Sequence, residues 1–142
     1  MKKLFLTFTL VLILGATQAF AVKHVVTVLD TKDPKKVEAT LHVVKKTLKA
    51  HPGQVTIVFD DKAIELLDTR KQPLMLKNGK TLHQEIRDFI EAGVNVTACS
   101  KCVSRMPEMR PRDMVPGTGL TAEDPVTKLD KAKKVRFDYY YE

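Results

Sequence analysis

The chain has only two cysteines, and what else it lacks excludes several classes of function. Two cysteines are too few for a disulfide scaffold, which a chain of 142 residues does not need. The sequence has no glycine-rich phosphate loop and no dinucleotide fingerprint. No two of its four histidines have a metal-ligand spacing on one helical face, and none accompanies a nucleophilic serine motif. We therefore expect no cofactor, and we interpret the histidines as structural or solvent-facing.

Long apolar runs are also scarce, and the longest lies at the N-terminus. Lys2 and Lys3 precede an apolar segment, residues 4–14, and a small-x-small motif, residues 19–21. This pattern is typical of a bacterial secretory signal peptide that is cleaved after residue 21. We expect a signal peptide over residues 1–21, export to the periplasm and one folded domain over residues 22–142. No other segment is long enough to cross a bilayer, so we expect no stable membrane insertion after cleavage; an uncleaved membrane anchor is the alternative.

The positive charge of the chain is moderate and spread out. The formal net charge is +7, and loss of Lys2 and Lys3 with the signal peptide lowers it by two. We interpret the remaining lysines as a solvated surface. A basic surface could also favour anionic small molecules by steering them. Export also argues against nucleic acid as a partner.

Short apolar, β-branched segments alternate with segments of helical periodicity. Asp33 and Pro34 suit a helix start, Thr81 and Gln84 form a capping-box pattern, and Gly93 suits a helix end. The expected strands are residues 24–29, 54–59, 94–98 and 135–141, with a short one at 114–115. The expected helices run from residue 34 to just before residue 52, over 63–67, from 82 to 92, and over 130–134. This order predicts a three-layer α/β/α sandwich with a mostly parallel sheet of about five strands.

The two cysteines, Cys99 and Cys102, follow the third expected strand at its carboxyl end, where α/β folds place their chemistry. Sulfur transfer and thiol exchange require a thiolate, which a helix start and nearby cations such as Lys101 and Arg105 stabilise. These residues predict a thiol site. Cys99 is the candidate nucleophile or persulfide carrier, Cys102 the resolving thiol, and Arg105 a helper that binds the anion. The expected partners are anionic sulfur species or a partner thiol protein.

A second pair of polar residues follows the second expected strand. Asp60 and Asp61 stand at the carboxyl side of the sheet, where paired carboxylates could bind a cation. Capping of the short helix by Asp61 explains them more simply.

The chain also resembles the DsrE/DsrF-like family. The resemblance rests on the strand-helix-strand start, the Ala63-x-x-Leu66-Leu67 helix, residues 93–96 (GVNV), the Cys-x-x-Cys loop with Arg105, and residues 112–117 (RDMVPG). It implies a five-stranded α/β/α sandwich, assembly into homo-oligomers (trimers or hexamers), and a first cysteine that accepts sulfur in a persulfide relay. The chain departs from the family pattern at residues 106–109, which replace an expected glycine. The signal peptide also separates it from the cytoplasmic relay partners.

Other functions stay open at this stage. The two cysteines could form an inert disulfide that pins the loop in an oxidising compartment. With Met106, Met109 and Met114 they form a run of soft ligands that suits Cu(I), although core packing also explains the methionines. A non-catalytic, oligomeric interaction module is a third possibility, which the aromatic end, Phe137 with residues 139–141, would fit. Among these, we favour a sulfur carrier or binding protein over an enzyme that turns over substrate.

Overall fold

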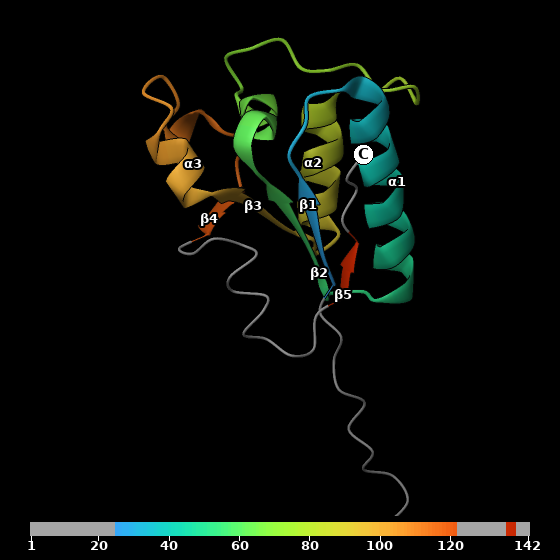
Figure 1. The fold of residues 1–142 in the computed structure, drawn as a ribbon. Helices are drawn as coiled ribbons and strands as arrows, with labels where there is room; N and C mark the ends of the chain where they lie inside the picture. The colour runs from blue at the N-terminus through green and yellow to red at the C-terminus, as the bar shows by residue number, and fades with distance from the viewer. Residues whose placement is uncertain (1–24, 122–135, 139–142) are drawn as a thin grey trace, which may run out of the picture.

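A single parallel sheet organises the chain. The computed structural model describes residues 25–121 and the backbone of residues 136–138. The sheet has five strands in the order β4-β3-β2-β1-β5, and every neighbouring pair is parallel (Figure 1). The strands are β1 (Val25–Leu29), β2 (Val55–Phe59), β3 (Asn95–Cys99), β4 (Gly119–Thr121) and β5 (Arg136–Asp138). Helices flank this sheet, which confirms the predicted α/β sandwich.

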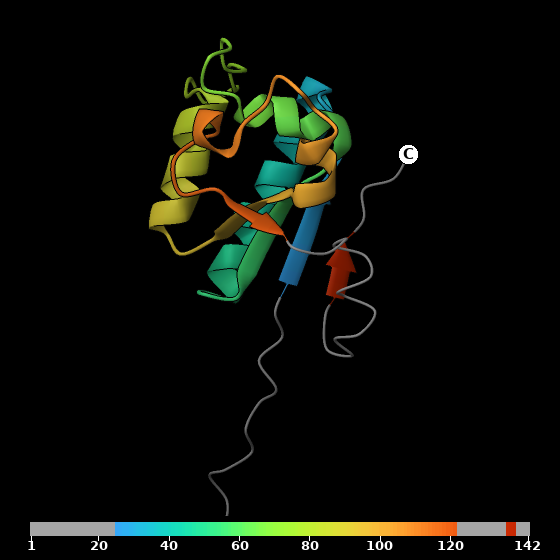
Figure 2. The same cartoon turned by 90° about the vertical axis from the view of Figure 1, so that its left-hand side faces the viewer.

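The two long helices cover one face of the sheet. Helix α1 (Pro34–Ala50) packs on β1 and β2, and α2 (Leu82–Glu91) packs on β3. An ion pair between Lys45 of α1 and the buried Glu85 of α2 joins the two helices. The 3-10 helix η1 (Asp61–Leu67) and the short helix α3 (Ser100–Ser104) contact each other at the carboxyl ends of β2 and β3, away from α1 (Figures 1 and 2). None of the described helices combines the length and apolarity that a bilayer span requires.

Local signals in the sequence set the helix boundaries. The Asp33 carboxylate accepts hydrogen bonds from the backbone N–H groups of Lys35 and Lys36, and the predicted capping box at Thr81 is present. The prediction that Asp61 caps the short helix is wrong. Asp60 is the capping residue, because its extended backbone lets its side chain accept the Asp61 N–H at 2.8 Å. Asp61 is the first helical residue and has a φ of 44°.

The predicted strand at residues 114–115 is also wrong. Met114 forms only an isolated antiparallel bridge with Asp68, and the Val115 N–H donates to the Leu67 carbonyl at 3.0 Å. Both residues are buried against the end of η1, so they do not pair with β3. The fourth strand begins later, at Gly119. β5 confirms a final edge strand, whereas the helix expected at residues 130–134 and the tyrosines at 139–141 lie outside the described residues.

Gly117 gives a direct test of the turn that leads into β4. Its φ is +92°, and an added Cβ would lie 3.1 Å from Cγ2 of Ile90 on α2. Gly79 has a similar φ, +84°, with open space around it. We expect Gly79→Ala to lose about 1–2 kcal/mol through backbone strain alone, and Gly117→Ala to lose more because Ile90 must also shift. Urea unfolding of both variants measures the difference, and equal losses would contradict this packing.

Candidate functional site

The register between β2 and β3 brings a carboxylate beside the cysteine pair. Phe59, the last residue of β2, is paired with Ala98 of β3. Asp60 follows Phe59 and Cys99 follows Ala98, so Asp60 and Cys99 lie at the same edge of the sheet. The local sequence patterns put Asp60 and Cys99 at strand ends without showing that the two residues are neighbours. The missed signal is that parallel neighbours end at one edge.

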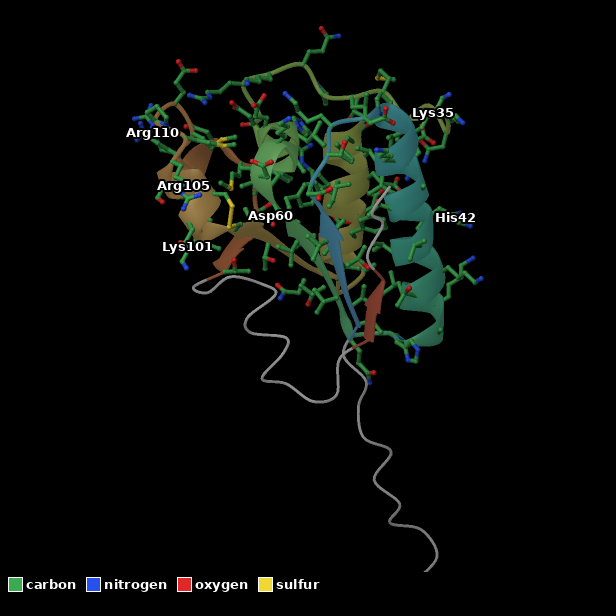
Figure 3. The ribbon with its side chains drawn as sticks, viewed as in Figure 1. Lys35, His42, Asp60, Lys101, Arg105 and Arg110 are labelled. Carbon is green, nitrogen blue, oxygen red and sulfur yellow. A yellow bond between two sulfur atoms is a disulfide. The ribbon has the colours of Figure 1, made fainter. Side chains whose placement is uncertain are left out.

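Cys99 and Cys102 are joined by a disulfide. Cys99 is both the last residue of β3 and the N-cap of α3, and the two Cα atoms are 5.2 Å apart, within the usual range for disulfides. The backbone N–H of Cys102 donates a hydrogen bond to Cys99 Sγ at 3.3 Å. Figure 3 shows the sulfur–sulfur bond between α3 and Asp60. The first turn of α3 thus holds both sulfur atoms in place.

The two cysteine residues differ in how exposed they are to solvent. The Cys99 residue is 5% exposed, whereas Cys102 is only partly buried. Asp60 Oδ1 lies 2.9 Å from Cys102 Sγ, and the three groups form a cluster whose ligand atoms all lie within 4.8 Å of one another. Cys102 is therefore the more exposed residue of the pair.

Arg105 is close to this cluster in sequence, but the described residues show no hydrogen bond or ion pair between them. It is the exposed C-cap of α3, and within residues 25–121 its guanidinium forms no hydrogen bond or ion pair with either sulfur atom. Lys101 is also exposed on α3 (Figure 3). The Arg105 side chain lines a neighbouring cleft, so its role as a helper for anions stays a prediction.

That cleft lies between the end of η1 and the loop after α3. It has a volume of about 580 Å³ and continues into a hollow of about 270 Å³ that Arg105 lines. The lining of the larger part is mostly charged: Asp68, Arg70, Lys71, Pro107, Glu108 and Arg110. Neither cysteine lines it.

Arg70 holds the two walls of the cleft together. Its guanidinium donates to both oxygens of the buried Asp68 carboxylate at 2.9 Å and to the Glu108 carbonyl at 2.7 Å. The hydrogen bond from Arg70 lowers the pKa of Asp68 below its usual range. In the same region, a hydrogen bond from Lys32 lowers the pKa of Glu65. The loop that follows the cysteines is therefore anchored to the end of η1 through the hydrogen bond from Arg70 to the Glu108 carbonyl.

The methionines that follow the cysteines along the chain pack in the apolar core, in the same cluster as Cys99. Met109 and Met114 are buried in the apolar core, and Met106 packs against it. This favours the core-packing interpretation over thioether ligation. His83 is also structural, because its Nε2 lies 2.9 Å from the Leu66 carbonyl oxygen and must donate to it.

Comparison with solved structures shows what this fold is similar to. The chain matches the protein of unknown function MTH1491 from Methanobacterium thermoautotrophicum with a TM-score of 0.64 and 15% identity, over 82% of this chain and 99% of that one. It matches the YchN protein of E. coli with a TM-score of 0.62 and 13% identity, over the same shares. No protein-family profile and no curated protein matches the sequence. Both neighbours have the DsrE/DsrF-like fold, so the chain shares that fold.

The Asp68–Arg70 pair predicts how stability depends on pH. The pKa of Asp68 is lowered in the folded state, so its contribution is present above the ordinary aspartate pKa of about 3.9 and is lost as the pH falls through the folded value. We expect Asp68→Asn to be less stable than wild type at pH 7, with a gap that narrows below about pH 4. Asp88→Asn, which breaks an exposed pair with Lys80, should change stability less. Urea unfolding between pH 7 and pH 3 checks this; a constant gap would contradict it.

Proposed function

We propose that the chain handles sulfane sulfur through Cys99, as a carrier with Cys102 as the resolving thiol. The observation that supports this most strongly is the hydrogen bond from the Cys102 N–H to Cys99 Sγ. A hydrogen bond to a sulfur anion favours the charged form. Reduction of the disulfide therefore yields a Cys99 thiolate that the first turn of α3 already stabilises.

Opening of the disulfide begins at the more exposed sulfur. An external dithiol attacks Cys102 Sγ through one thiolate, the Cys99–Cys102 bond breaks, and Cys99 leaves as the stabilised thiolate. The second thiol of the dithiol then releases Cys102. The dithiol is oxidised to its own disulfide, and the protein gains two electrons.

Loading needs no further oxidant. The Cys99 thiolate attacks a sulfane sulfur of an inorganic polysulfide, and one sulfur–sulfur bond of the polysulfide breaks. The products are a persulfide on Cys99 and a polysulfide shorter by one sulfur atom, which carries away the electron pair. An acceptor thiolate that attacks the outer sulfur atom then regenerates the Cys99 thiolate.

The persulfide on Cys99 can also react with Cys102 instead of an external acceptor. Its thiolate attacks Cys99 Sγ, the bond to the outer sulfur breaks, and hydrosulfide leaves. The Cys99–Cys102 disulfide forms again, and the sulfane sulfur takes both electrons. The structure supports this step because it already holds both sulfur atoms in the bonded arrangement that the step produces.

Mass spectrometry of cysteine variants tests this proposal. Reduced protein, freed of reductant without oxygen, is treated with polysulfide. We expect Cys102→Ser to accumulate an adduct of one sulfur atom, because it cannot resolve the persulfide. Wild type should show the adduct only briefly and then release sulfide as the disulfide forms, and Cys99→Ser should show little adduct.

Two results would overturn this function. An undiminished adduct in Cys99→Ser would move the carrier role to Cys102. No adduct on any reduced variant, with folding verified by circular dichroism, would favour the inert disulfide. Serine at position 99 is a matched control because it is a good N-cap residue for α3.

We also propose that the protein is exported after cleavage of residues 1–21, on the basis of the sequence pattern. Expression of the full chain in a bacterium followed by fractionation and intact-mass measurement tests this. We expect a periplasmic protein that begins at Val22, and Ala21→Arg should accumulate as the uncleaved precursor because the site then lacks its small residue. Full-length wild-type chain in the cytoplasm would contradict export.

A further inference from the structure

We propose that the reduced protein has a divalent metal site formed by Asp60, Cys99 and Cys102, suited to Zn²⁺. One ligand atom from each residue lies within 4.8 Å of the other two. Metal-bound sulfur and oxygen atoms stand about 2.0–2.3 Å from Zn²⁺, so an ion at the centre can reach all three with small side-chain movements. The site does not depend on sulfur transfer, only on reduction of the disulfide.

The fold positions these ligands on two elements. Asp60 is held at the end of β2, where its N–H donates to the Leu29 carbonyl at 2.8 Å and its carboxylate caps η1. Cys99 is held at the end of β3, and α3 returns Cys102 to the same point. A carboxylate from one strand therefore faces two sulfur atoms from the next.

The donor set decides which metal fits. Two thiolates and a carboxylate are a mixed set of soft and hard ligands, which Zn²⁺ accepts and Cu(I) does not prefer. Core packing accounts for Met109 and Met114 without a metal, because both are buried in the apolar cluster. Three protein ligands leave a fourth position for water, as in exchangeable zinc sites rather than closed structural ones.

Binding is coupled to the redox state of the pair. An external dithiol first reduces the disulfide, and the ion then replaces the two thiol protons, which are released to solvent. The oxidised protein has no thiolate to offer. Metal binding and disulfide formation therefore compete for the same two sulfur atoms.

Titration of reduced full-length protein with Cd²⁺ tests the site, because cadmium–thiolate bonds absorb in the ultraviolet. We expect one ion per chain, displaced by Zn²⁺, with release of protons and no binding by the oxidised protein. Cys99→Ser and Cys102→Ser should lose the absorption. Bound Zn²⁺ should also slow disulfide formation by diamide.

Asp60→Asn isolates the carboxylate. Asparagine preserves the capping hydrogen bond to the Asp61 N–H but is a poor ligand, so we expect binding to weaken about tenfold or more. Asp61→Asn is the matched control: it removes the same charge one residue away, and asparagine tolerates the positive φ at that position. Its affinity should equal that of wild type.

Two outcomes would overturn the metal site. Unchanged binding in Asp60→Asn would exclude the carboxylate as a ligand. Binding by wild type no tighter than by free dithiothreitol would exclude a preformed site. Neither result decides the persulfide test, because that test compares the cysteine variants with wild type and measures the mass of a sulfur adduct without metal.

Discussion

The parallel register between β2 and β3 is the constraint on which the site depends. Pairing of Phe59 with Ala98 puts the next two residues, Asp60 and Cys99, side by side at the edge of the sheet. A slip of one residue would turn every side chain of β3 to the opposite face. The register is fixed because Phe59, Val96 and Ala98 are all fully buried beneath the helices. Core packing thus determines which polar groups meet at the strand ends.

The site combines a cysteine pair from the end of β3 with a carboxylate from the end of β2. The short helix α3 gives Cys99 Sγ an amide donor and returns Cys102 to it. Asp60 adds a carboxylate from the neighbouring strand. The disulfide is the state seen in the structure, and the proposed thiolate and metal complex both require its reduction.

The similarity to solved structures supports the fold of this chain, whereas its function has to be argued from the site residues. The likeness to MTH1491 and YchN establishes the architecture, at 15% and 13% identity. Many functions share one fold, so the function has to be argued from the residues of the site. The expected homo-oligomer, the partner thiol protein and the role of Arg105 stay predictions.

Most of the fold could be predicted because its signals are local. The apolar, β-branched runs marked β1, β2 and β3, and the capping patterns at Asp33 and Thr81 marked the helix starts. Prediction from the sequence failed for segments whose conformation depends on residues far away in the chain. Residues 114–115 looked like a strand but are held against Leu67 and Asp68, and β4 is only three residues long.

The sequence by itself determined the α/β class, the starts of α1 and α2, and the place of the cysteine pair after β3, since these depend on neighbours within a few positions. Only the tertiary structure decided that Asp60 lies beside Cys99. It also decided that Met109 and Met114 are core residues and that Cys102 is the more exposed cysteine. The physical reason is that these facts depend on which strands become neighbours and on which side chains they bury. Asp60 and Cys99 are 39 positions apart, so the residues around each of them do not reveal that the two side chains lie close together.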